Sequence, residues 1–149
     1  MPSDRLASKG GSAKVESRKL FTPESANGAL VLVRRIVTDI SREYRGLMEL
    51  RRQRESLSFG PTKPEQLTAL RELAEKAVEK LTAYQEELAE VGCSLKDYAA
   101  GLVDFPAMHE GRVVYLCWKL GEERIAHWHE VDSGYRGRHA VDAEFGDTR

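Results

Sequence analysis

All four histidines of the chain lie between His109 and His139. Two of them, His127 and His129, are separated by one residue in a segment whose composition is typical of a β-strand. Side chains alternate between the faces of a strand, so both imidazoles would project from one face, about 6–7 Å apart. Two imidazoles at that spacing can bind one zinc, nickel or iron ion if a third group joins them. The pattern predicts either a divalent metal site or two histidines hydrogen-bonded in a polar groove.

Several nearby side chains could supply a third ligand, namely Asp104, His109, Glu110, Cys117, Glu130 and Asp132. Cys117 lies between Leu116 and Trp118, which favours a buried, inert thiol over a nucleophile. Arg136 and Arg138 occur in a loop punctuated by glycines and could clamp the carboxylate or phosphate of a small anionic ligand. The alternative for both arginines is solvation or pairing with carboxylates.

Asp104 lies between Val103 and Phe105, so the sequence forces a carboxylate into apolar surroundings. Burying a charge is unfavourable unless it pairs or binds something. His129 follows Trp128, so its imidazole also lies next to an apolar side chain and needs a polar or charged partner. We expect the two side chains to meet, because the carboxylate would then hold the imidazole in one tautomer. Such a pair would serve either a functional site or the internal stability of the module.

Two long helices must position these groups. Thr22 and Pro23 are typical of a helix start, and Gly92 is typical of a helix end. Between them, two stretches carry apolar residues spaced alternately three and four apart, separated by a turn rich in proline at residues 60–64. This pattern predicts a long, antiparallel, coiled-coil-like helical hairpin over residues 22–91. In the register that pairs all seam positions, Ile40 faces Leu81.

The hairpin also carries apolar residues beside its seam, namely Ile36, Met48, Leu50, Leu73 and Val78. Two helices cannot cover all of them. Either the C-terminal module or a second subunit must do so, and the simplest expectation is a homodimer.

The C-terminal third changes to alternation and glycine-rich turns, which predicts a small antiparallel β-module. Its main strands are expected at residues 112–120 and 124–131. A two-residue turn at Gly121 and Glu122 would place His127 opposite Leu116, whereas a longer loop would place it opposite Cys117. Turn chemistry favours the first register and separation of polar from apolar faces favours the second; we expect the first.

Composition excludes several classes of protein. The chain has 149 residues, 41% hydrophobic and 32% charged, which suits one packed domain. Its formal net charge of -1 argues against nucleic-acid binding. No apolar run approaches the roughly 20 residues that span a bilayer, and no secretory signal is visible. With only two cysteines, reduced thiols are expected. We therefore expect a cytoplasmic protein that binds neither nucleic acid nor membranes.

The chain is expected to have three parts. Residues 1–20 lack apolar periodicity and predict a disordered tail. Residues 21–140 form a single α+β domain, made of the helical hairpin and a β-module over 93–138. Residues 141–149 are expected to fray.

Six short motifs follow one another along the chain: Phe21-Thr22-Pro23-Glu24-x-Ala26-Asn27, Gly101-Leu102-Val103-Asp104-Phe105-Pro106, Leu116-Cys117-Trp118, Gly121-Glu122, Trp128-His129-Glu130 and Gly134-Tyr135-x-Gly137-Arg138. In this combination they resemble the bacterial family called domain of unknown function 2203, over roughly residues 20 to 140. The family is uncharacterised, so the resemblance implies no reaction. In its pattern the histidine after the tryptophan is a fixture, whereas the position of His127 is often aromatic. The resemblance thus implies a site built from Asp104, Glu122, His129, Glu130 and Arg138.

Two functions fit these observations. The first is a non-enzymatic, oligomeric binding or assembly protein, because the heptad seam is longer than a catalytic scaffold of this size needs. Its polar pocket would lie in the β-module and use Asp104, Glu122, His129, Glu130, Arg136 and Arg138. The alternative is a small metal-dependent hydrolase of the zinc type that uses His127 and His129.

Overall fold

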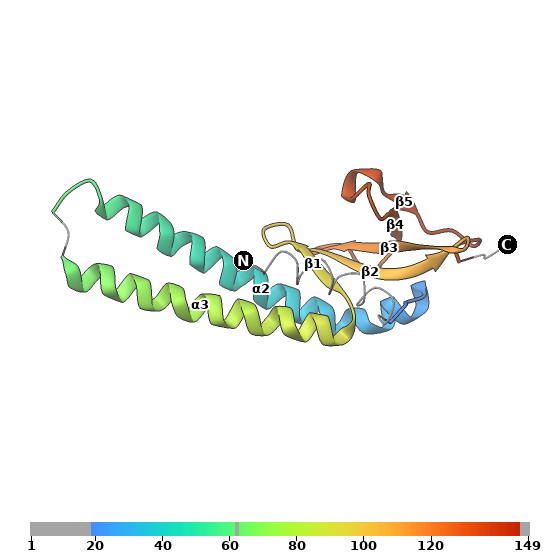
Figure 1. Cartoon of the computed structure of the whole chain (residues 1–149), viewed down its shortest axis with the longest axis horizontal. Coiled ribbons are helices and arrows are strands. Elements are labelled where there is room, and N and C mark those ends of the chain that lie inside the picture. The colour runs from blue at the N-terminus through green and yellow to red at the C-terminus, as the bar shows by residue number, and fades with distance from the viewer. Residues whose placement is uncertain (1–18, 62, 147–149) are drawn as a thin grey trace, which may run out of the picture.

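The structure, a computed structural model, describes residues 19–61 and 63–146. Two long helices come first, α2 (Pro23–Leu57) and α3 (Pro64–Val91), and a five-stranded sheet follows them. The sheet lies along one end of the helical hairpin, and the other end projects well beyond it (Figure 1). This arrangement confirms the predicted α+β fold with a C-terminal β-module. Most of the predicted N-terminal tail, residues 1–18, lies outside the described residues.

The ends of the helices follow the predicted signals. The hydroxyl of Thr22 accepts a hydrogen bond from the backbone N–H of Ser25, and the Ser25 hydroxyl accepts one from the N–H of Thr22. This reciprocal cap satisfies two backbone donors that the first helical turn leaves without partners. Helix α3 ends at Gly92, whose φ of +111° is left-handed and suits glycine.

Most of the predicted seam between the helices is buried or partly buried, except Leu67 near the turn, which is 37% exposed. From α2 the buried part contains Leu30, Val33, Val37, Ile40 and Leu47, and from α3 it contains Ala77, Leu81 and Leu88. An ion pair between Glu43 and Lys80, at 3.6 Å, agrees with antiparallel packing of the two helices. Direct contact of Ile40 with Leu81 stays a prediction.

The sheet is antiparallel throughout, with its strands in chain order, and a short 3-10 helix, η1 (Tyr135–Gly137), precedes the last strand. The strands are β1 (Ser94–Asp97), β2 (Leu102–His109), β3 (Arg112–Lys119), β4 (His127–Glu130) and β5 (His139–Ala140). Alternate residues of β2 and β3, including Phe105, Leu116 and Trp118, are fully buried and form one core with the first half of α2. The opposite face of the sheet is therefore free to carry polar side chains.

The structure corrects the expected register of β3 and β4. Cys117, not Leu116, lies opposite His127, and Tyr115 lies opposite His129. A two-residue turn does not form, because the loop between β3 and β4 is hydrogen-bonded to α2. The side chain of Asn27 donates to the carbonyl of Ile125 at 3.1 Å and accepts from its N–H at 2.8 Å. Ile125 is thereby buried, and the longer loop shifts the register by one residue.

The sheet covers only part of the apolar surface beside the seam. Ile36 is 4% exposed and belongs to the core, whereas Leu73 and Val78 remain 52% and 48% exposed. Both lie on the part of α3 that precedes the region under the sheet. The β-module thus leaves the outer half of the hairpin uncovered.

The segment after the last strand also packs against the domain. The ring of Phe145 stacks on that of His109 at 4.6 Å, and Val141 is partly buried against the core. The sequence predicted fraying from residue 141. The rings that contact this segment belong to β2 and β4, which lie far from it in the sequence, so no local pattern indicated the contact. Residues 147–149 lie outside the described part of the chain.

Candidate functional site

The outer face of the sheet, turned away from the helices, carries a cluster of polar side chains. The register places Asp104 of β2 opposite Cys117 of β3, and Cys117 opposite His127 of β4. Alternation along β4 brings His129 to the same face. The buried core residues alternate with these positions. Three strands therefore combine one carboxylate, one thiol and two imidazoles on a single surface.

Asp104 and His129 meet as the sequence predicted. The Nε2 atom of His129 lies 3.0 Å from Oδ1 of Asp104, and the two residues are 2% and 4% exposed. On its other side, Nδ1 of His129 lies 2.7 Å from the carbonyl oxygen of Glu130. A carbonyl only accepts, so Nδ1 carries a proton and donates it. Nε2 is thus the atom that faces Asp104, and one proton is shared between them or the pair is ionic.

Cys117 completes a compact group with this pair. Its sulfur, a carboxylate oxygen of Asp104 and a ring nitrogen of His129 all lie within 4.8 Å of one another. Burial, and then the neighbouring charge of Asp104, raise the pKa of the Cys117 thiol to about 12. The nearby charge of Arg138 opposes this shift without reversing it, so the thiol is protonated at neutral pH, and a bound cation would favour its thiolate.

This group lies at the wall of a cleft with a volume of about 540 Å³. Asp104, Cys117 and His129 line it from the sheet, together with Tyr115. The segment of residues 131–135, which follows β4, also lines it. The cleft is large enough to hold water or a small molecule beside this buried group.

Beside this cluster, Arg138 organises a second set of contacts. Its Nη2 donates to Oε1 of Glu122 at 2.8 Å and to Nδ1 of His127 at 3.0 Å. Its guanidinium lies over the ring of Tyr135, 4.5 Å from the centroid. Because an arginine only donates, Nδ1 of His127 is the acceptor and carries no proton. His127 is thus held by Arg138 and not by the Asp104–His129 pair.

The contact with Arg138 also favours the ionised form of Glu122. Burial alone would raise the pKa of its carboxyl group, but the hydrogen bonds from Arg138 and from the backbone N–H of Lys119 outweigh burial and lower the pKa below its ordinary value. The pair leaves Arg138 already engaged with a carboxylate, which is the arrangement that the sequence offered as the alternative to anion binding.

Of the remaining candidates, Asp132 lines the cleft, whereas Glu130 and Arg136 do not. Glu130 lies on the opposite face of the sheet, where its carboxylate pairs with the guanidinium of Arg112 and that guanidinium lowers its pKa. Arg136 is exposed on η1. From the sequence, Cys117 is one of six possible third ligands. The strand alternation that selects it depends on the β3–β4 register.

Together these features define an α+β protein in which a helical hairpin supports an antiparallel sheet with a polar cleft on its outer face. The family model of the uncharacterized conserved proteins designated DUF2203 matches residues 19–141. The chain belongs to this family. No curated protein and no solved structure matches it. Within the described residues, no helix combines the length and the apolar character required to cross a membrane.

Proposed function

We propose that this protein is a non-enzymatic binding and assembly protein that forms a homodimer through its helical hairpin and presents the cleft of its sheet to a ligand. The observation that carries the proposal is an apolar groove of about 550 Å³ on the projecting part of the hairpin. We call it the hairpin groove. It is lined by Leu47, Leu50, Leu70, Ala74 and Val78, with charged residues at its rim.

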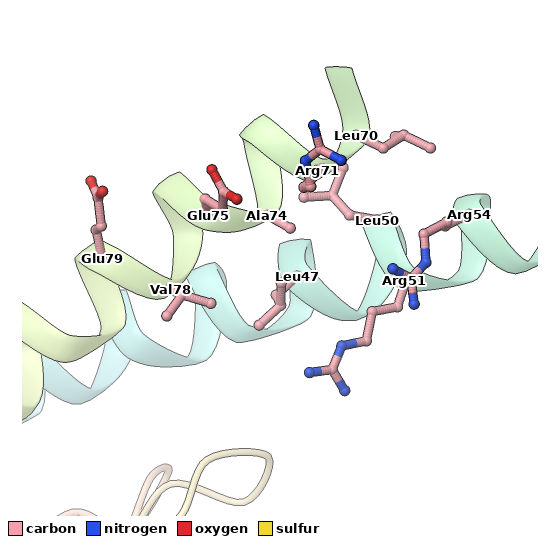
Figure 2. A pocket seen from close by; sticks show the side chains of 10 residues that line it. All are labelled: Leu47, Leu50, Arg51, Arg54, Leu70, Arg71, Ala74, Glu75, Val78 and Glu79. Atoms are coloured by element: carbon pink, nitrogen blue, oxygen red, sulfur yellow. The ribbon is translucent and has the colours of Figure 1, made fainter. Parts of the chain in front are cut away.

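Charges at the rim of the hairpin groove are separated along its length. Arg51 and Arg54 of α2 lie toward the turn between the helices, whereas Glu75 and Glu79 of α3 lie toward the sheet (Figure 2). A two-fold axis through the middle of the groove would exchange its two ends. The arginines of one copy would then face the glutamates of the other. This self-complementarity supports a second copy of the chain as the occupant.

Apolar exposure points to the same surface. Val78, which lines the hairpin groove, is 48% exposed. A contiguous apolar patch rimmed by charges is typical of a protein interface. Burying this patch against its own copy would remove the surface that the β-module leaves uncovered.

The dimer can be tested with one charge placed in the hairpin groove. Val78→Glu should convert the dimer to a monomer in multi-angle light scattering of the full chain at micromolar concentration, because the carboxylate would be buried without a partner. Val31→Glu is the matched control, since Val31 is 71% exposed on α2 and does not line the groove. A monomeric unmodified chain, or two variants with the same mass, would contradict the proposal.

A second candidate function is a small metal-dependent hydrolase. The observation that favours it is the buried group of Asp104, Cys117 and His129 at the wall of a cleft that is open to solvent. The sequence offered His127 and His129 as the ligands, but the bond from Arg138 to His127 favours a set without His127. Zinc-dependent turnover of carboxylate or phosphate esters that is lost in His129→Gln would identify this activity.

A further inference from the structure

We propose that Asp104, Cys117 and His129 bind one divalent transition-metal ion of the zinc class, with an open coordination position that faces the cleft. The proposal stands independently of the homodimer. It rests on three side chains from three different strands, whose ligand atoms lie within 4.8 Å of one another and whose residues are at most 4% exposed.

The distances suit tetrahedral coordination. Zinc binds imidazole nitrogen and carboxylate oxygen at about 2.0–2.2 Å, so two such ligand atoms lie roughly 3.3 Å apart around the ion. Nε2 of His129 and Oδ1 of Asp104 are already 3.0 Å apart. The sulfur of Cys117, within 4.8 Å of both, needs to move by about 1 Å to reach bonding distance. Rotation of one side chain provides such a movement without changing the backbone.

The imidazole is oriented as a metal ligand requires. The bond from Nδ1 of His129 to the carbonyl of Glu130 assigns its proton to that nitrogen. Nε2 is then the atom that faces Asp104 and the cluster, and its lone pair becomes available to an ion once the shared proton leaves. Metal-bound histidines commonly donate their second N–H to a backbone carbonyl, which fixes the tautomer and the direction of the ring. The same contact would do so here.

Charge balance also favours a divalent ion. A carboxylate from Asp104, a thiolate from Cys117 and a neutral His129 carry two negative charges, which a divalent cation neutralises. Binding would displace two protons, one from the thiol and one shared between His129 and Asp104. A neutral complex is the form that a buried site holds most easily. The mixture of sulfur, nitrogen and oxygen favours zinc, cobalt or iron(II) over magnesium or calcium.

Within the described part of the chain, three protein groups converge, so the fourth position of a tetrahedral ion would face the cleft. Tyr115 and Asp132 line the same cleft as Asp104, Cys117 and His129. Three protein ligands with one open position are typical of sites that bind water or an exogenous group, whereas structural zinc sites use four. The site would therefore serve ligand capture in the cleft and not merely fasten the strands.

Lys96, Tyr115 and Asp132 also line the cleft, and the ammonium of Lys96 lies over the ring of Tyr115, 5.8 Å from its centroid. The remaining histidine and cysteine considered as ligands are engaged elsewhere. His127 accepts a hydrogen bond from Arg138, and Arg138 pairs with Glu122. Cys93, the second buried cysteine, lies at the end of α3, where its thiol contacts the carbonyl of Leu88. His127 and Cys93 therefore supply matched controls, one histidine and one cysteine outside the proposed set of ligands.

The test uses Co²⁺ as the probe, added to the full chain purified without a metal-affinity tag. Cobalt occupies zinc sites and gives a thiolate-to-cobalt charge-transfer band in the near ultraviolet when a cysteine is a ligand. We expect that band at one equivalent of Co²⁺, and displacement of the cobalt by Zn²⁺. Cys117→Ser and His129→Gln should lose the band, whereas Cys93→Ser and His127→Gln should keep it.

Several outcomes would overturn the assignment. The unmodified chain gives the decisive result, because absence of a charge-transfer band in it needs no variant to interpret. A band that persists in Cys117→Ser, or that disappears in Cys93→Ser, would place the ion elsewhere. Loss of the band in His127→Gln, with circular dichroism unchanged, would make His127 a ligand and contradict the proposed set.

Discussion

Among single residues, Arg138 and His129 each organise a separate group of hydrogen bonds on the outer face of the sheet. Arg138 binds Glu122 and His127, while His129 binds Asp104 and the carbonyl of Glu130. Each histidine of the H-x-H pair therefore has its own partner. The pair does not act as one unit, although strand alternation places both rings on the same face.

The Glu122–Arg138 pair predicts a pH-dependent contribution to stability. The pKa of Glu122 is lowered in the folded chain, so the carboxylate stabilises the fold above its unfolded pKa and that contribution is lost as pH falls through the folded pKa. Glu122→Gln should lower the free energy of unfolding by about 1 kcal/mol at neutral pH. Urea unfolding measured between about pH 7 and pH 3 should show the difference shrink toward zero.

Glu123→Gln is the control for this experiment, because Glu123 is the next residue of the same loop and its side chain is exposed. It should match the unmodified chain at every pH. A Glu122→Gln deficit of the same size at low pH would show that the ion pair does not stabilise the fold.

Within the elements, the helical hairpin takes its stability from the buried seam. Leu81 is 6% exposed, so Leu81→Ala should cost about 2–5 kcal/mol in denaturant unfolding. Leu73→Ala removes the same atoms from a side chain that is 52% exposed and should cost far less. Equal losses in the two variants would contradict the seam.

The strands show how far sequence reasoning extends. Helix ends and seam positions were predictable because caps and heptads are local signals. The β3–β4 register was not, because Asn27 holds Ile125 across 98 positions of the chain and overrides the local turn signal. Membership of Cys117 in the polar group follows from that register. By contrast, the separation of Glu130 from the cleft could have been predicted, because neighbours in a strand face opposite sides.

At the scale of the whole molecule, the two ends of the hairpin have different surroundings. One end supports the sheet through a shared core, and Tyr44 of α2 stacks on Tyr98 beside β1 at 5.4 Å. The other end projects away from the sheet and carries the hairpin groove (Figure 1). A dimer formed there would keep both clefts accessible, because each lies on the outer face of its own sheet.

The most direct test of this assembly is a charge exchange measured by sedimentation velocity of the full chain. Arg54→Glu should weaken the dimer by placing it against Glu79 of the second copy, and Glu79→Arg should weaken it by facing Arg54. The double variant, Arg54→Glu with Glu79→Arg, restores opposite charges across the two-fold axis and should recover dimerisation. A double variant no better than either single variant, or an unmodified chain that sediments as a monomer at micromolar concentration, would contradict the account.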